Sequence, residues 1–374
     1  MKKILLIILL LATATIVWSN TDKSNSERAE ELLNCVLYSV FYEPLDNVEK
    51  MIFLQEASDL GNGMASHELA FYYKDKYINK VISLYEKSFE QGHTYSAVEL
   101  GNIFLHNEKV ADKEKAIGYF RKAIDNGLEC EQSKDRVIMG DLDEEVDYKE
   151  VQKRARKGDL GCQYLVLGKQ LDTFYFIDWG KKAAKINEII SKLTKLYEKK
   201  YSPAAYSLAE FYKSECRTSL AKPYFIENPS NKALKWYTKA AELGHAEAAY
   251  QLGKEYAEYD SVLEIEQDLE QSAKWFKIAA NQGHAKAQYE LGIYYQFSSL
   301  KDYKANPSVR LNQKQKESSK WFFHAARNGN EEAIKRVQSI YYSSISEIMR
   351  KEMTEQLNEQ REKFDEWLKS NGYL

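Results

Sequence analysis

The sequence has little excess charge of either sign. Its 374 residues carry 53 Lys and Arg against 56 Asp and Glu, a formal net charge of −3. A nucleic-acid surface requires excess positive charge, and no cluster of Lys and Arg interleaved with stacking aromatics forms a known motif, so we expect no nucleic acid as partner. Hydrophobic residues (44%) and charged residues (29%) occur as in ordinary folded chains, which argues against extensive disorder.

Catalytic and metal-binding motifs are also missing. The sequence contains no H-E-x-x-H, no G-x-S-x-G and no phosphate-binding glycine loop, so it predicts no catalytic residues, no metal ion and no small-molecule cofactor. Three of the six histidines directly follow a helix-ending glycine in different repeats, which indicates a structural role and places them too far apart to share an ion. The histidines are His67, His93, His106, His245, His284 and His324. An enzyme with dispersed residues, such as one acting on cell-wall fragments, is the less favoured alternative.

Cysteines are few and show no paired spacing. The four are Cys35, Cys130, Cys162 and Cys216, and no two form a C-x-x-C motif. Cys130 and Cys162 begin equivalent segments of successive repeats, so a disulfide between them is conceivable. Neighbouring helices usually lie roughly 8–10 Å apart, whereas a disulfide requires closer Cα atoms. The sequence leaves this pairing open.

The longest apolar run lies at the N-terminus and falls short of the roughly 20 residues that span a bilayer. Lys2 and Lys3 precede the apolar residues 4–12, and small residues follow, which is the pattern of an export signal. We therefore expect residues 1–19 to be a cleaved signal peptide, with the bond after Ala14 as the second choice of cleavage site. The mature protein, starting at Asn20, is expected to be periplasmic or secreted and not embedded in a membrane. An uncleaved anchor is the alternative.

The sequence does contain an internal repeat. Residues 233–248 (ALKWYTKAAELGHAEA) recur closely as residues 272–287 (SAKWFKIAANQGHAKA). Such a period is typical of a helical solenoid, in which each unit buries its apolar face only against its neighbours. The glycine that ends the first helix of each repeat recurs along the chain, with Tyr201 standing in its place once. These positions are Gly61, Gly92, Gly127, Gly158, Tyr201, Gly244, Gly283 and Gly329.

Each repeat is expected to form a pair of helices. In the first helix Trp236 and Ala240 are four residues apart and share a face, and Gly244 follows at a site suited to a left-handed helix end. The second helix carries a mid-helix glycine, which costs about 1 kcal/mol relative to alanine and therefore predicts that another backbone approaches closely. These glycines are Gly101, Gly168, Gly253 and Gly292.

The predicted fold is all-α: an α/α superhelical solenoid of about seven to eight helix-pair repeats over residues 46–345. A helix within residues 20–45 caps one end, and a charged amphipathic helix within residues 346–374 caps the other. The longest insertions are expected at residues 217–231 and 297–317, which are rich in Ser, Asn, Lys and Pro.

These motifs resemble the Sel-one-like repeat (SLR) family, relatives of the tetratricopeptide repeats. Its L-G helix, A-x-x-x-L-G-x-x-Y, is matched at residues 248–256 and 287–295, and its A-x-x-W-Y-x-K-A-A-x-x-G helix at residues 233–244. The resemblance implies a right-handed superhelix whose concave face, lined by the L-G helices, binds a protein or peptide partner, with no catalytic residues. It also implies an exported scaffold or, as an alternative, a periplasmic immunity protein that inhibits a toxic effector such as a phospholipase.

A tyrosine stripe is the candidate binding site. When the Leu of each L-G pair is counted as the seventh helix position, the fifth position holds a tyrosine in three consecutive repeats. If the L-G helices line a groove, these rings form a concave stripe of the kind that anchors protein partners. Packing against the adjacent repeat, with only hydroxyls exposed, is the alternative. The candidate residues are Tyr206, Tyr250 and Tyr289, with Glu210, Lys254 and Ile293 one turn further on.

Overall fold

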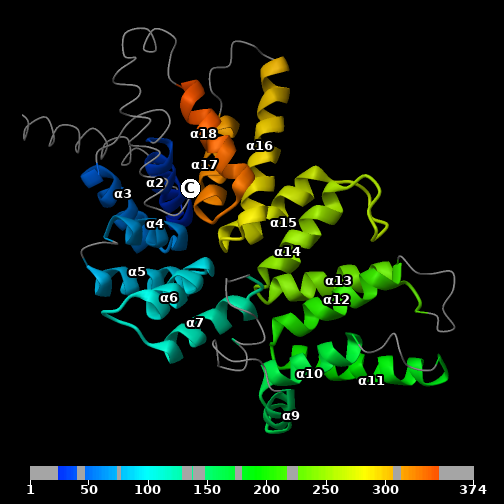
Figure 1. Ribbon diagram of the computed structural model, residues 1–374. Coiled ribbons are helices and arrows are strands. Elements are labelled where there is room, and N and C mark those ends of the chain that lie inside the picture. The colour runs from blue at the N-terminus through cyan, green and yellow to red at the C-terminus, as the bar shows by residue number, and fades with distance from the viewer. Residues whose placement is uncertain are drawn as a thin grey trace, which may run out of the picture.

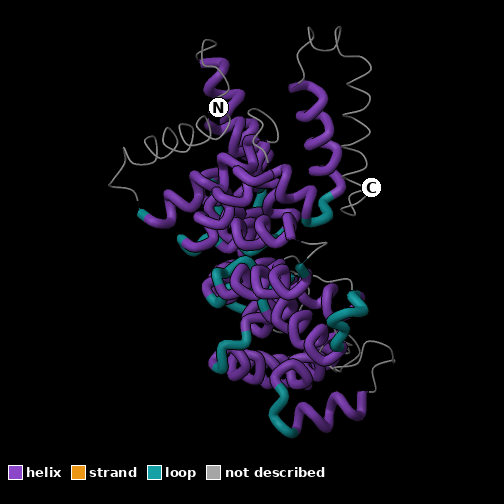
Figure 2. Tube along the Cα trace, turned by 90° about the vertical axis from the view of Figure 1, so that its left-hand side faces the viewer, coloured by secondary structure: helices purple, strands orange, loops and turns teal. Residues whose placement is uncertain are grey.

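The computed structural model describes residues 24–39, 47–73, 77–128, 137, 148–172, 179–216, 226–305 and 313–344. Within these ranges all regular secondary structure is helical, and short loops join the helices (Figures 1 and 2). The helices are α2 (Asn25–Ser39), α3 (Asn47–Asp59), α4 (Gly63–Tyr73), α5 (Ile78–Glu90), α6 (Tyr95–His106), α7 (Lys113–Asp125), α9 (Tyr148–Arg156), α10 (Leu160–Asp172), α11 (Trp179–Glu198), α12 (Ser202–Cys216), α13 (Pro229–Glu242), α14 (Ala246–Ala257), α15 (Leu269–Asn281), α16 (Ala285–Ala305), α17 (Gln313–Arg327) and α18 (Glu331–Ser344).

The structure confirms an all-α repeat solenoid. Only some of its predicted domain boundaries fall within the described residues. α2 lies inside the expected N-terminal cap, whereas the expected signal peptide and the C-terminal cap at 346–374 lie outside the described residues. Cys130 also lies outside them, so its pairing with Cys162 stays open. The insertion expected at 297–317 is corrected in part, because α16 continues as a helix to Ala305 and α17 begins at Gln313.

In the described part of the chain, a left-handed residue follows the first helix of every repeat. All seven marker glycines have φ between 75° and 100°, a conformation that glycine adopts without steric cost. In the remaining repeat the left-handed residue is Lys200, with φ 65°, and not Tyr201 as expected. Tyr201 instead occupies the next position, which His245 and His284 fill in their repeats.

The histidines after the glycines begin the second helices. Nδ1 of His245 accepts a hydrogen bond from the backbone N–H of Ala248 (3.2 Å), and Nδ1 of His284 accepts one from that of Ala287 (3.1 Å). Each imidazole therefore satisfies a backbone donor that the first turn of the helix leaves unpaired. These contacts give His245 and His284 the structural role predicted for them.

Aromatic rings, not backbones, approach the mid-helix glycines. A Cβ placed on Gly101 would lie 2.4 Å from the ring of Phe120, and one on Gly253 would lie 2.4 Å from the ring of Phe276. Gly292 faces Phe322 in the same way, at 2.8 Å. The expected backbone contact is therefore wrong: the glycine makes room for a ring from the next first helix. Gly168 differs, because no described atom lies within 4 Å of a Cβ added there.

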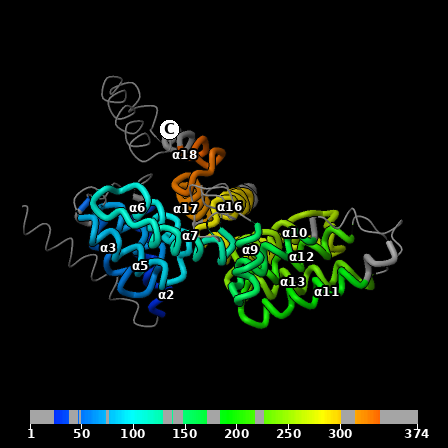
Figure 3. Tube along the Cα trace, turned by 60° about the horizontal axis from the view of Figure 1, so that its bottom comes forward, coloured from blue at the N-terminus to red at the C-terminus, as the bar shows by residue number. Residues whose placement is uncertain are grey.

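The array folds back on itself, which repeat periodicity does not predict. The N-terminal half (residues 24–128) lies beside the C-terminal half (residues 202–344), with the repeats in opposite order (Figures 1 and 3). The backbone N–H of Ala246 donates to the carbonyl of Asn126 (2.8 Å), and that of Tyr95 donates to the carbonyl of Gln282 (3.0 Å). Repeats far apart in the sequence are thus in contact, and the expectation that units contact only their neighbours is wrong here.

We call this contact between the halves the seam. On it, histidines of one half pack against left-handed glycines of the other. A Cβ on Gly127 would lie 2.4 Å from Nδ1 of His245, and one on Gly283 would lie 2.3 Å from Cβ of Tyr95 and 3.3 Å from Nε2 of His93. Ala246 also joins an apolar cluster with residues of the N-terminal half, including Val98. Any side chain at these two glycines would therefore separate the halves.

Helix α17 closes the far end of the seam against the N-terminal helices. Arg327 in α17 forms an ion pair with Glu68 in α4, and their side chains are only 8% and 6% exposed. Nζ of Lys320, a buried residue of α17, lies 3.3 Å from Glu30 in α2 and 3.1 Å from Glu317. The two ends of the described array are therefore joined by charge pairs, which Coulomb attraction strengthens where water is excluded.

The buried histidine of the seam is expected to make stability pH-dependent. Burial lowers the pKa of His93 to about 4, whereas an unfolded histidine titrates near 6.5. Between these values the unfolded chain binds a proton that the folded chain does not. The contribution of His93 to the unfolding free energy is therefore complete above pH 6.5 and decreases by about 2 kcal/mol as the pH falls to about 4.5.

The His93→Gln variant is expected to have a flatter pH dependence over this range. Urea unfolding at pH 7 and pH 4.5 measures the difference for wild type and variant. His106 is exposed, so His106→Gln serves as the matched control and should behave as wild type. An unchanged pH dependence in His93→Gln would contradict the assignment.

Candidate functional site

The predicted tyrosine stripe lies on three second helices of the C-terminal half. Tyr206, Tyr250 and Tyr289 each come one helical turn after the start of α12, α14 and α16. The starts of these helices belong to the seam or adjoin it: Oγ of Ser202 donates to the carbonyl of Asp125, 2.5 Å away. The stripe therefore runs beside the N-terminal half, and not along a wide open groove.

The tyrosine rings pack against the following repeat. Tyr206 stacks on His245 with ring centroids 4.6 Å apart and 14° between the planes, and Tyr250 stacks on His284 at 4.7 Å and 25°. Tyr289 contacts Phe322 at 5.6 Å. All three side chains are half-buried. The ring faces therefore pack as the alternative of packing against the adjacent repeat expects. Only the ring edges and hydroxyls are available to a partner.

The residues one turn further on differ in their surroundings. Glu210 is exposed and accepts a hydrogen bond from Oη of Tyr237. Burial, followed by the charge of Glu210, raises the pKa of Tyr206. Lys254 is half-buried, and Ile293 packs against the core.

The hydroxyls of Tyr206 and Tyr250 thus remain protonated at neutral pH. Burial also raises the pKa of Tyr250, to about 12. Protonated phenols donate hydrogen bonds while their rings stay packed. The chemistry offered along the stripe is hydrogen bonding beside the carboxylates of Glu210, Glu247 and Glu290 and the ammonium of Lys254.

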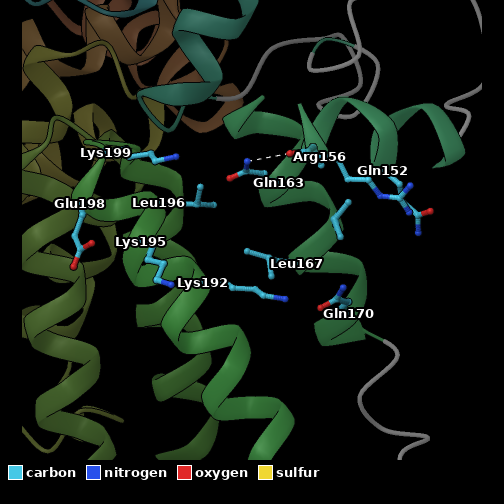
Figure 4. A pocket seen from close by; sticks show the side chains of 12 residues that line it. Gln152, Arg156, Gln163, Leu167, Gln170, Lys192, Lys195, Leu196, Glu198 and Lys199 are labelled. Carbon is cyan, nitrogen blue, oxygen red and sulfur yellow. Dashed lines mark hydrogen bonds between the residues drawn. The ribbon is translucent and has the colours of Figure 1, made fainter. Parts of the chain in front are cut away.

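A second candidate site, which the sequence prediction missed, is a groove between α10 and α11 (Figure 4). Its volume is 760 Å³. Leu167 and Gln170 from α10 face Lys192, Lys195 and Leu196 from α11 across it. We call this the α10–α11 groove.

The rim of the groove is cationic and its floor is apolar. Arg156, Lys192, Lys195 and Lys199 line it and are exposed, and Glu198 is the acidic residue among the lining residues that the structure describes. Lys192 pairs with Glu188 at 2.5 Å, whereas no ion pair joins the other three cations to the described chain. The apolar lining consists of Ala155, Val166, Leu167 and Leu196.

The repeat that forms the groove also lacks a ring that three other repeats have. Phe120, Phe276 and Phe322 each stand seven residues before a left-handed glycine and fill the space over the glycine of the preceding helix. Seven residues before Lys200 stands Leu193, and the glycine on the preceding helix, Gly168, meets no described atom within 4 Å. A leucine fills less volume than a phenylalanine, so α10 and α11 are not packed together here as the other repeats are.

A local charge bias is the sequence signal for this groove. Residues 148–200 contain 13 Lys and Arg against six Asp and Glu, an excess of seven positive charges in a chain whose formal net charge is −3. Averaging over the whole chain conceals this excess, and the expectation of no nucleic-acid partner rested on that average and on known motifs.

Other chemistry is sparse in the part of the chain that the structure describes. There, no group of three or more His, Cys, Asp or Glu side chains is placed to hold a metal ion. Nor is any helix in that part long and apolar enough to cross a membrane. A polar cavity of 260 Å³ lies beside the seam near His93 and Lys320.

Comparison with known proteins identifies the repeats. The family model of the Sel1 repeat matches residues 95–128, 228–245, 246–284 and 285–308. No curated protein matches the sequence. A Sel1 repeat protein from Oxalobacter formigenes is similar in structure, with 18% identity, coverage of 90% of this chain and 93% of that one, and a TM-score of 0.37. A protective antigen of uropathogenic Escherichia coli that displays an SLR fold has 19% identity, coverage of 84% and 72%, and a TM-score of 0.30.

Proposed function

The chain is a Sel1 repeat protein, and from this premise we propose that it is a protein-binding scaffold whose tyrosine stripe contacts a protein or peptide partner. Sel1 repeat proteins generally mediate protein–protein interaction, and the family is typically non-catalytic. The observation that carries the proposal is the recurrence of a half-buried tyrosine at one helix position in three consecutive repeats, beside Glu210 and Lys254.

The stripe suits a partner that accepts or donates hydrogen bonds. The rings are held by stacking on His245 and His284, so binding requires little further loss of side-chain freedom. Tyrosines fixed in this way, with an apolar body and a polar edge, are typical anchors of interfaces.

We further propose that the scaffold acts outside the cytoplasm, on the strength of the export-signal pattern in residues 1–19. An inhibitor of a single toxic enzyme is a special case of this function. It would be distinguished by one partner bound in a stoichiometric complex.

Replacing Tyr206, Tyr250 and Tyr289 together by phenylalanine is expected to abolish partner capture while changing the unfolding free energy by less than about 1 kcal/mol for each hydroxyl removed. Phenylalanine keeps the ring packing and removes only the hydroxyl. The measurement is quantitative affinity capture from the host with the chain from Asn20 onward, together with urea unfolding.

The matching alanine triple variant serves as the structural comparison. Because the rings pack on the next repeat, it should lose several kcal/mol of stability. Recovery of the same partners by wild type and the phenylalanine variant would overturn the stripe as the binding site.

A further inference from the structure

We propose that the α10–α11 groove is a second interaction surface and that it takes an acidic, leucine-containing segment of a partner protein. The groove lies on α9, α10 and α11, whereas the stripe lies on α12, α14 and α16, so this proposal does not depend on the stripe.

Charge complementarity indicates that the occupant of the groove is negatively charged. Arg156, Lys195 and Lys199 are exposed on the rim, and no ion pair joins them to the described chain. Unpaired cations held around one cavity create a positive potential that attracts and orients an acidic partner. Such side chains also cost little to engage, because no existing ion pair must be broken first.

The floor defines the apolar part of the occupant. Leu167 and Leu196 are buried in the helix pair, and with Val166 and Ala155 they form the bottom of the groove. An apolar side chain placed there would be removed from water, and this burial would favour binding. A leucine flanked by Asp or Glu matches both the floor and the rim.

The lining disfavours a nucleic acid as occupant. Binding of single strands relies on aromatic side chains on which bases stack, and the described lining contains none. An amphipathic polypeptide segment uses the apolar floor, which a phosphate backbone would leave exposed.

The test measures binding of four synthetic peptides to the chain from Asn20 onward by fluorescence anisotropy. Each peptide has about 15 residues and carries either Glu or Gln at its polar positions and either Leu or Ser at its apolar positions. The four combinations separate the contribution of charge from that of apolar burial. We expect the Glu/Leu peptide to bind at least about 10-fold more tightly than the other three. Its affinity should fall as salt rises from about 0.05 to about 0.5 M, because screening weakens charge attraction.

Reversal of the rim charges should abolish this binding. The variant carries Lys192→Glu, Lys195→Glu and Lys199→Glu. A matched control reverses three exposed lysines elsewhere, Lys235→Glu, Lys274→Glu and Lys335→Glu, and changes the net charge equally. We expect at least about 10-fold weaker binding in the rim variant and less than about twofold change in the control.

Three results would overturn the proposal. They are equal binding of the Gln/Leu peptide, equal loss in both charge variants, and tighter binding of a 15-nucleotide oligo-dT than of the Glu/Leu peptide. The phenylalanine variant of the stripe should bind the peptide as wild type does, so failure of the groove and failure of the stripe are separable.

Discussion

Arg327→Ala is expected to lower the free energy of unfolding by about 3–5 kcal/mol, because it leaves the buried carboxylate of Glu68 without its cation. The loss is large because Glu68 is only 6% exposed and water does not replace the guanidinium. Arg327 also covers the ring of Phe71, 4.4 Å from the ring centroid, so the truncation removes packing as well. Urea unfolding followed by circular dichroism measures the change.

A double variant separates the ion pair from the packing. Glu68→Gln combined with Arg327→Met removes both charges, so it should be more stable than Arg327→Ala alone. Lys87→Ala breaks an exposed pair with Asp59 and should cost less than about 1 kcal/mol. If Arg327→Ala costs no more than Lys87→Ala, the contact between α4 and α17 does not stabilise the protein.

Gly253→Val is expected to cost about 1–3 kcal/mol, because the new Cβ would lie 2.4 Å from the buried ring of Phe276. The ring is fixed within the core and has little freedom to move aside. Gly253→Ala should be destabilising in the same direction and by less.

Gly168→Ala is the matched control, and its effect should have the opposite sign. Gly168 occupies the same L-G position, but no described atom lies within 4 Å of an added Cβ. Alanine in a helix interior is then favoured over glycine by about 0.5–1 kcal/mol. Thermal unfolding of both variants measures these effects. Equal destabilisation at the two glycines would show that the contact with the Phe276 ring does not set the cost at Gly253.

Features that depend on neighbouring residues were predictable from the sequence. The helix ends at Gly244 and Gly283 follow from backbone conformation alone, and the contacts within each helix pair follow from side chains one turn apart. The single error in repeat register, Tyr201 for Lys200, arose where a lysine replaced the glycine marker.

Features that depend on distant residues were not predictable. The seam is made by backbone groups at helix ends, such as those of Asn126 and Ala246, whose hydrogen bonds leave no periodic pattern in the sequence. The α10–α11 groove lies between two helices far less closely packed than other helix pairs, and the absent ring opposite Gly168 produces no motif. The stripe residues were identified by position, but the stacking of their rings on His245 and His284 required the structure.

The seam also restricts how this protein can change in length during evolution. An open solenoid tolerates gain or loss of a repeat, because each unit interacts with the units next to it. Here Gly127 is matched with His245, and Gly283 with His93, so one extra repeat in either half would shift every later pair out of alignment. Duplications are therefore expected to survive in pairs, one in each half, or at the turn between the halves, where they leave the matching intact.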